Sequence, residues 1–135
     1  MRILIVDDDT SLLDLMSAML ASKGLTNVKK SSSYREVLAA IDMDMGKSEP
    51  FDLIFCDCYV PGMDMMGFIN GLEKRKFRGA VVLMTGAGLE VLESRELLAS
   101  RKNLNILGAI QKSSLEQGMN DMLHKLGHSA AKPAA

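Results

Sequence analysis

Residues 51–64, FDLIFCDCYVPGMD, decide the fold of this chain. Residues 51–56 are mainly apolar, which predicts a β-strand, and Asp57 follows that strand directly. The Val60-Pro61-Gly62 sequence predicts a turn, and Met65 to Lys76 carries apolar residues at helical spacing. We therefore expect a strand that ends in an acid, then a loop, then a helix.

The same alternation of strand and helix runs through the rest of the chain. Such alternation implies a parallel sheet with right-handed crossovers and helices on both faces. Residues 3–6 and 81–83 are almost continuously apolar, which fits strands buried on both sides. We expect a doubly wound, flavodoxin-like α/β fold with strand order 2-1-3-4-5. The other predicted strands are Arg2–Val6, Asn27–Lys30, Ala80–Met84 and Leu104–Ile110, and the other predicted helices are Ser11–Lys23, Tyr34–Ile41, Leu89–Arg101 and Ser114–Leu126.

The composition is that of one globular domain. A net charge of −1 over 135 residues gives no electrostatic reason to expect binding to nucleic acid or to an anionic membrane. No apolar run is long enough to span a bilayer, and the N-terminal MRILIVDDD meets acids too early for a secretory signal. We expect a cytoplasmic protein with one domain over residues 1–126 and a tail or linker stub over 127–135.

Two cysteines flank Asp57. Residues two apart on a strand face the same side, and Cys56 and Cys58 are therefore poorly placed for a disulfide with each other. The chain has no further cysteine to complete a zinc site, and His124 and His128 lie far downstream. We expect two buried free thiols.

Chemically active side chains follow four of the predicted strands. Asp7 and Asp8 follow the first strand, Asp57 the third, Thr85 the fourth and Lys112 the fifth. The carboxyl ends of parallel strands share one edge of the sheet, so these groups should converge. Two carboxylates ~4–5 Å apart repel by about 3–4 kcal/mol at an effective dielectric constant near 20. A lysine and a divalent cation would relieve this repulsion, and an all-oxygen ligand set favours Mg²⁺.

Each of these residues also has a simpler interpretation. Asp9 or Thr10 would serve as the cap of the first helix, and Thr85 before a Gly-Ala-Gly sequence fits ordinary turn chemistry. Asp57 and Lys112, taken singly, fit solvated surface charges. The convergence of all four strand ends on one edge favours a functional site.

Four sequence runs resemble a known family. ILIVDDD at 3–9, FDLIFCDCYVPGMD at 51–64, VVLMTG at 81–86 and LGAIQK at 107–112 are similar, in order and spacing, to the receiver domains of bacterial two-component response regulators of the chemotaxis-regulator type. The resemblance covers residues 1 to about 126.

The resemblance implies a role for each matching residue. Asp57 would accept the phosphoryl group. Asp8 and Asp57 would bind Mg²⁺ directly, Asp7 would act mainly through water, and the main-chain carbonyl of Tyr59 would be a further metal ligand. The two remaining positions, Thr85 and Lys112, would contact phosphoryl oxygens.

The resemblance also implies partners. The phosphoryl donor would be a phosphohistidine on a sensor histidine kinase or a phosphotransfer protein, although small phosphodonors are alternatives. A downstream effector protein would dock around Leu89–Arg101 and Ser114–Leu126. The chain would be a regulator that phosphorylates and dephosphorylates itself, which leaves open whether it should be called an enzyme.

Three positions depart from the family pattern. Ser113 follows Lys112 where the family has a proline joined by a cis bond; a non-proline cis bond costs about 2.5–4 kcal/mol, and we nevertheless expect the cis bond to be retained. Ala109 replaces the usual Tyr or Phe, so we expect a signal to leave through residues 86–88 and the following helix. Met65 replaces a glycine, where it would either shield the phosphorylated site, cover a docking groove or pack in the core.

Two alternative functions remain. Asp7-Asp8-Asp9 superficially offers the Asp-x-Asp signature of haloacid dehalogenase-type phosphatases, but that fold needs an acidic pair after the lysine and only Asp121 lies there. A pseudo-receiver, which keeps the fold and binds proteins without phosphorylation, is the other alternative.

Overall fold

The computed structural model describes residues 1–44, 51–58, 60, 62–86 and 103–127. Within these ranges the chain forms a five-stranded sheet in the order β2-β1-β3-β4-β5, and every neighbouring pair is parallel. This confirms the predicted flavodoxin-like α/β topology. The strands are β1 (Ile3–Val6), β2 (Val28–Ser31), β3 (Leu53–Asp57), β4 (Ala80–Thr85) and β5 (Asn105–Gln111).

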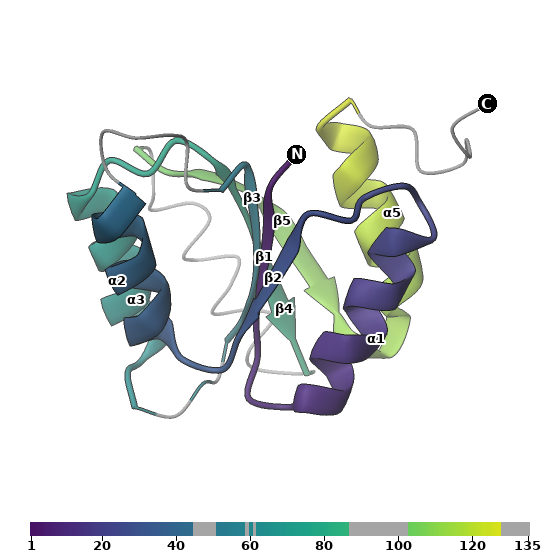
Figure 1. Ribbon diagram of the computed structural model, residues 1–135, viewed down its shortest axis with the longest axis horizontal. Coiled ribbons are helices and arrows are strands. Elements are labelled where there is room, and N and C mark those ends of the chain that lie inside the picture. Colours follow the sequence, from purple (N-terminus) through teal and green to yellow (C-terminus); the bar gives the residue numbers. More distant parts are fainter. Residues whose placement is uncertain (45–50, 59, 61, 87–102, 128–135) are drawn as a thin grey trace.

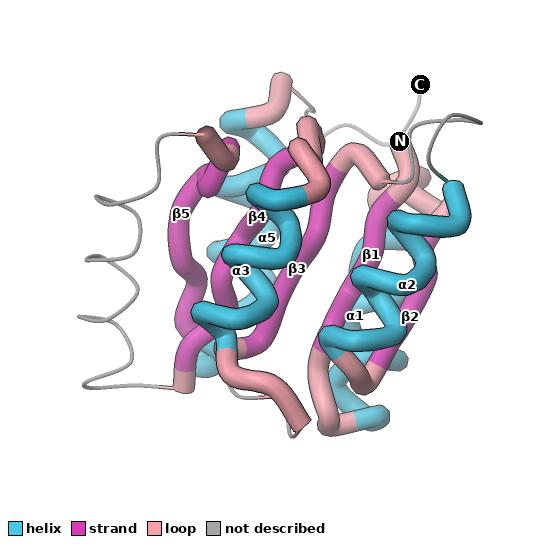
Figure 2. Tube along the Cα trace, turned by 90° about the vertical axis from the view of Figure 1, so that its left-hand side faces the viewer, coloured by secondary structure: helices cyan, strands magenta, loops and turns pink. Residues whose placement is uncertain are grey.

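Helices cover both faces of the sheet. Figure 1 shows α2 and α3 on one face and α1 and α5 on the other, and Figure 2 shows the strands running side by side between them. The helix predicted over Leu89–Arg101 lies outside the described residues. The described helices are α1 (Thr10–Ala21), α2 (Tyr34–Asp44), α3 (Met65–Lys74), the short 3₁₀ helix η1 (Lys112–Ser114) and α5 (Leu115–Lys125).

The sheet separates two apolar cores, because successive side chains of a strand point to opposite faces. Leu4 and Cys56 pack with α2 and α3, whereas Ile5 and Phe55 pack with α1 and α5. Strands β1, β3 and β4 are buried along their whole length. The near-continuous apolar sequence of these strands follows from burial on both sides.

Local capping determines where helices begin and end. The carboxylate of Asp9 accepts hydrogen bonds from the amides of Ser11 (3.0 Å) and Leu12 (3.2 Å), which confirms the capping role predicted for it. Gly24, at φ +81°, follows the end of α1 in a conformation that glycine adopts without strain. The Asp9 cap begins α1 directly after β1, and Gly24 ends the helix before the chain enters β2.

The Lys112–Ser113 bond corrects one prediction. No peptide bond among the described residues is cis, so this bond is trans and the expectation of a retained cis bond was wrong. Serine lacks the tertiary amide that makes the cis form cheap before proline. The chain instead enters η1 at Lys112, and α5 follows directly.

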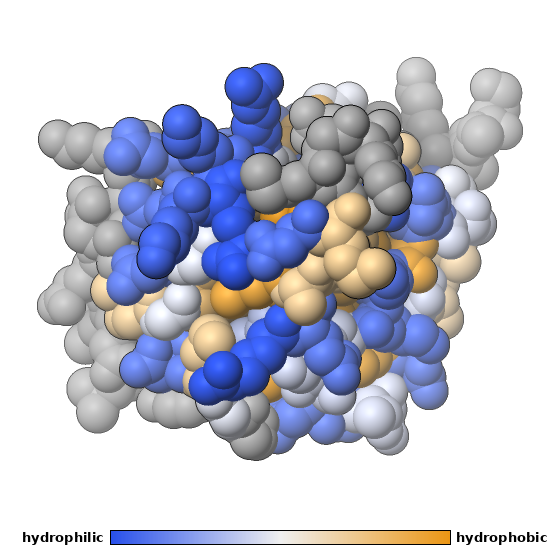
Figure 3. Space-filling view, turned by 60° about the vertical axis from the view of Figure 1, so that its left-hand side comes forward, coloured by the Kyte–Doolittle hydropathy of each residue, from blue (hydrophilic) through white to orange (hydrophobic). Residues whose placement is uncertain are grey.

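The surface is mixed in polarity. On the side that carries α2 and α3, hydrophilic side chains surround a smaller apolar area (Figure 3). The helices that the structure describes are all too short or too polar to cross a membrane. The large apolar side chains lie mainly against the sheet, with Met43 and Met66 among the exceptions that remain exposed.

Candidate functional site

Three carboxylates meet at the carboxyl ends of β1 and β3. Asp7 is fully buried and Asp57 is 4% exposed, whereas Asp8 is open to solvent. One ligand oxygen from each of the three residues lies within 4.8 Å of the others. The predicted convergence of these acids is confirmed.

The three acids that follow β1 have two roles, in the local backbone structure and in the site. Asp7 Oδ1 accepts a hydrogen bond from the Asp9 amide at 2.9 Å, which turns the chain sharply after the strand. Asp9 is used as the cap of α1, as described above. Asp7 and Asp8 are therefore the acids of this run that remain for the site.

Lys112 brings a cation to the buried carboxylates. Its Nζ lies 2.9 Å from Asp7 Oδ2 and 3.2 Å from Asp57 Oδ1. Both contacts are ion pairs. Among the described residues, Asp7 Oδ2 accepts no hydrogen bond of regular geometry, so its contact with Lys112 is one of charge. Burial lowers the pKa of Lys112, but the neighbouring Asp7 and Asp57 carboxylates outweigh it and the net pKa is raised. Lys112 therefore stays protonated and offsets part of the repulsion among the acids.

Thr85 lies at the same edge of the sheet, at the end of β4. The residue is fully buried, and its Oγ1 donates a 3.4 Å hydrogen bond to the carbonyl of Ile110 on β5. In this structure the hydroxyl is thus directed to the main chain of the neighbouring strand.

The oxygen-rich set fits a small divalent cation. Asp7, Asp8 and Asp57 supply carboxylates, the hard ligands that Mg²⁺ prefers. Tyr59, whose carbonyl was expected to be a further ligand, lies outside the described residues, as do Ala87 and Gly88, through which the signal was expected to leave.

The neighbours of the site bear on two further expectations. Cys56 and Cys58 are buried and free, as predicted, and burial, followed by the nearby Cys58, raises the pKa of the Cys56 thiol well above its usual value. Met65 is half-buried and packs against the α2–α3 core, which supports the packing interpretation for this residue. Ala109 is also half-buried against that core.

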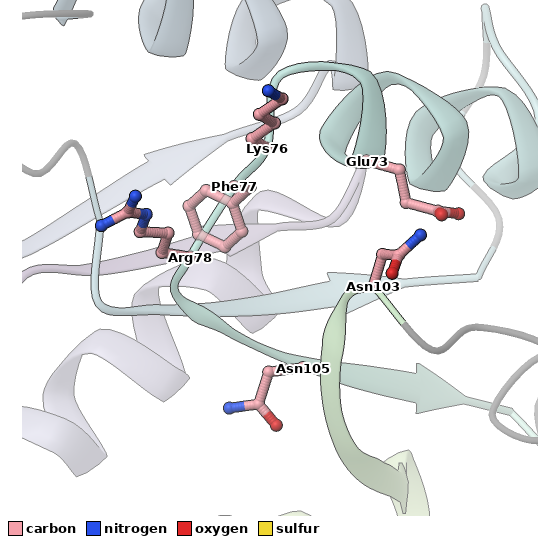
Figure 4. Close-up of a pocket in the computed structure, with 6 residues that line it drawn as sticks. All are labelled: Glu73, Lys76, Phe77, Arg78, Asn103 and Asn105. Atoms are coloured by element: carbon pink, nitrogen blue, oxygen red, sulfur yellow. The ribbon is translucent and has the colours of Figure 1, made fainter.

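A separate hollow lies at the opposite edge of the sheet (Figure 4). It has a volume of about 470 Å³ and is formed where α3 ends and β4 and β5 begin. In the figure the side chains of Lys76 and Arg78 extend away from the ring of Phe77. The hollow is remote from the strand ends that carry the acids, so it is not part of their site. Its lining residues are Glu73, Lys76, Phe77, Arg78, Asn103 and Asn105.

Sequence reasoning missed one contact of Asp57. The phenol of Tyr34, the first residue of α2, donates a hydrogen bond to the main-chain carbonyl of Asp57. Its ring stacks on Phe68 of α3 with a centroid separation of 4.4 Å and an interplanar angle of 12°. The sequence signal was weak, because an aromatic residue at the start of a helix usually indicates only core packing.

Comparison with known proteins agrees with this geometry. The family model described as the response regulator receiver domain matches residues 3–122. The chain belongs to this family. A curated relative of this receiver, the cell cycle transcriptional regulator CtrA of Caulobacter vibrioides, is 29% identical over 87 residues, which is 64% of this chain. The match covers 35% of CtrA, so the chain spans about a third of that regulator.

Solved structures resemble the receiver over nearly its whole length. A response regulator from Colwellia psychrerythraea is 27% identical with a TM-score of 0.71, covering 93% of this chain and 94% of that one. The receiver domain of the sensor histidine kinase PA1611 from Pseudomonas aeruginosa, with a magnesium ion coordinated in its active site cleft, is 18% identical with a TM-score of 0.72, covering 93% and 97%. At 18% identity the second likeness shows the fold alone.

Family membership separates the two alternative functions. A receiver assignment removes the haloacid dehalogenase interpretation, in which Asp57 had no role. A pseudo-receiver would share the same family and fold, so the comparisons do not separate it from a receiver that is phosphorylated.

Proposed function

We propose that this receiver accepts a phosphoryl group on Asp57 in a Mg²⁺-dependent reaction. The observation that carries the proposal is the meeting of Asp57 with Asp7, Asp8 and Lys112: three carboxylates with ligand oxygens within 4.8 Å of one another, and one lysine in contact with two of them. A surface-charge interpretation explains neither the burial of Asp7 and Asp57 nor the lysine between them.

The chemistry is phosphoryl transfer from nitrogen to oxygen. A carboxylate oxygen of Asp57 attacks the phosphorus of a phosphohistidine, the P–N bond breaks as the P–O bond forms, and the freed imidazole takes up a proton. The product is an acyl phosphate. Such transfers need accurate positioning and neutralisation of charge more than covalent work by the protein.

Each residue has a distinct task in this transfer. Asp7, Asp8 and Asp57 would hold Mg²⁺, which supplies positive charge to the phosphoryl oxygens when bound. Lys112, already 3.2 Å from Asp57 Oδ1, would follow the new P–O bond and pair with a second phosphoryl oxygen. Thr85 would release the carbonyl of Ile110 and donate its hydroxyl to a third.

The proposed donor is a phosphohistidine on a sensor histidine kinase or a phosphotransfer protein, and the reaction would take place in the cytoplasm. Phosphorylation would change binding to a downstream effector protein. Because Ala109 has no ring to change position, we infer that the signal leaves Thr85 through the loop that starts at Gly86.

Intact-protein mass spectrometry tests this proposal directly. The wild type, mixed with acetyl phosphate and Mg²⁺, should gain the mass of one phosphoryl group, and Asp57→Asn should not. Asp9→Asn is the matched control, because asparagine caps a helix as well as aspartate and Asp9 is not among the proposed ligands. Phosphate retained in Asp57→Asn, or lost in Asp9→Asn, would contradict the assignment.

The pseudo-receiver remains the second candidate, because the bond after Lys112 is trans and Ala109 lacks the ring usual in the family. A Mg²⁺ titration separates the two. Binding to the folded state raises stability by RT ln(1 + [L]/Kd), so a functional site gains thermal stability at millimolar Mg²⁺. No change in the melting temperature would favour the pseudo-receiver.

A further inference from the structure

We propose that Tyr34 is a positioning residue for Asp57: its buried phenol holds the main-chain carbonyl of the phosphoacceptor and so fixes the direction of the reacting carboxylate. This inference rests on the function proposed above and extends it to a residue outside the cluster of charges. The phenol contacts the main chain of Asp57, so Tyr34 would act through Asp57 and not on the phosphoryl group.

The carbonyl of Asp57 lies just past the end of the pairing between β3 and β1. Toward β4, the ladder continues past Asp57, since the Cys58 amide donates to the carbonyl of Met84 at 3.1 Å. Toward β1, the pairing ends one residue earlier, at Val6 and Cys56. Buried carbonyl groups are normally hydrogen-bonded, and helices packed over a strand end are one source of donors. The phenol of Tyr34, from α2, donates to this carbonyl, and the Cys56 thiol, a weak donor 3.5 Å away, adds little.

The phenol is itself held in place from two sides. Tyr34 is 1% exposed and begins α2, and its ring lies flat against Phe68 of α3. Burial, followed by the nearby Cys56, raises the pKa of the phenol, which therefore remains a proton donor. A donor fixed by two helices leaves the carbonyl little freedom to rotate.

Fixing this carbonyl matters because it belongs to the reacting residue. The orientation of the Asp57 peptide sets the direction of its Cα–Cβ bond and hence the place of its carboxylate between Lys112 and Asp8. Reactive groups must be held within about 0.5 Å of the productive geometry, and a displacement of about 1 Å can slow a reaction on the order of 100-fold. Release of one hydrogen bond allows a smaller movement than that.

Tyr34→Phe removes the hydroxyl and keeps the stacked ring. We expect the main-chain ¹³C carbonyl resonance of Asp57 and the amide resonance of Cys58 to shift, because the hydrogen bond to that peptide is lost. At saturating Mg²⁺ and acetyl phosphate, the phosphorylation rate should fall by about 3- to 10-fold, the range expected for one neutral hydrogen bond. A tyrosine needed only for packing would move neither quantity.

Ser33→Ala is the matched control. The Ser33 hydroxyl accepts a 3.3 Å hydrogen bond from the Glu36 amide, so this change loosens the start of the same helix without touching Asp57. We expect it to lower the melting temperature while leaving the Asp57 carbonyl resonance and the rate as in the wild type. Phe68→Leu, which keeps the hydroxyl and weakens its support, provides a second variant if Tyr34→Phe does not fold; its rate should fall only if the carbonyl resonance also moves.

The possible results separate the two proposals. A wild type that takes up no phosphate overturns the proposed function, and with it the role of Tyr34. A phosphorylated wild type with an equally fast Tyr34→Phe overturns the role of Tyr34 alone. In whichever variant is used, a rate that falls without movement of the Asp57 carbonyl resonance also overturns it. A fall in rate together with that movement, absent from Ser33→Ala, supports it.

Discussion

In the described part of the chain, four charged side chains determine the electrostatics around Asp57. The carboxylates of Asp7, Asp8 and Asp57 converge, and Lys112 is the cation that the structure places against them. At ~4–5 Å and an effective dielectric constant near 20, each pair of acids repels by about 3–4 kcal/mol before screening by solvent. One lysine offsets part of this repulsion, and the remaining repulsion among the carboxylates destabilises the folded protein when no metal is bound.

Asp57→Asn should therefore stabilise the metal-free protein. Asparagine keeps the shape of the side chain and removes one of the repelling charges, so we expect the free energy of unfolding in EDTA to rise by about 1 kcal/mol. Urea unfolding of the wild type and the variant measures this difference. Asp14→Asn, on the exposed face of α1 where Asp14 pairs with Lys30 at 2.8 Å, serves as the control and should not raise stability. A less stable Asp57→Asn would show that the charges of the site are already balanced.

At the scale of elements, helix α5 lies close to β5 because glycine occupies the contact. A Cβ atom at Gly118 would lie 2.7 Å from both Cβ and Cγ2 of Ile110, and the Cβ atom cannot move without the strand. A Cβ atom at Gly71 of α3 would meet, at 2.8 Å, the terminal Cδ1 of Leu38, which can rotate away. The two glycines sit in helix interiors and differ in what opposes them.

These glycines predict opposite outcomes for the same substitution. Gly118→Ala should destabilise the fold by about 1–2 kcal/mol, because overpacking against β5 exceeds the gain in helix propensity. Gly71→Ala should be neutral or stabilise by up to about 1 kcal/mol, because the propensity gain remains and Leu38 can adjust. Chemical denaturation of both variants checks the contrast. Equal effects would mean that α5 is free to move away from the sheet.

Helices α2 and α3 are also joined by an ion pair with two contacts. Arg75 Nε and Nη2 donate to the Asp42 carboxylate at 2.7 and 3.0 Å, and these hydrogen bonds lower the pKa of Asp42 below its usual value of 3.8. A carboxyl group whose pKa is lowered by folding stabilises the protein above its unfolded pKa, and this contribution is lost as the pH falls through the lower, folded pKa.

Asp42→Asn should therefore be less stable than the wild type at pH 7 by a small amount, since the pair is exposed. The difference should persist down to pH 5 and shrink as the pH falls below about 4. Urea unfolding of both proteins at several pH values measures it. A stability difference that stays constant at every pH below 4 at which both proteins still fold would assign the effect to packing instead of charge.

The sequence was informative about elements and less so about contacts between them. Apolar runs ended by acids predicted β1 and β3. The carboxyl ends of parallel strands lie at one edge of the sheet, and this rule alone predicted that Asp7, Asp57 and Lys112 lie close together. The hydrogen bond of Tyr34 to Asp57 joins residues 23 apart and depends on how α2 lies over the strand end, which no local pattern encodes. The prediction of a cis bond at Lys112–Ser113 was wrong because it followed the family pattern, whereas a bond before serine ordinarily favours trans.

At the scale of the whole molecule, the site exists only when the sheet is assembled. Asp7 and Asp8 come from the end of β1 and Asp57 from the end of β3, and the register that aligns Val6 with Cys56 brings them together. Lys112 directly follows β5, and β4 lies between β5 and β3, so the pairing of three strands places this lysine beside the acids. An ion bound by residues from two strands should therefore stabilise the whole fold, because unfolding of either strand disperses the ligands.

Hydrogen exchange tests this linkage between metal and fold. If Mg²⁺ binds to the folded state alone, each tenfold rise in its concentration above Kd should slow exchange through global unfolding about tenfold, which corresponds to ~1.4 kcal/mol. The most protected amides of β1, β3 and β4 should slow by the same factor, although the ligands lie only at the strand ends. Asp8→Asn should weaken the effect throughout the sheet at once. Protection confined to residues 7–9 and 57–58 would instead mean that Mg²⁺ orders the site locally and leaves the stability of the sheet unchanged.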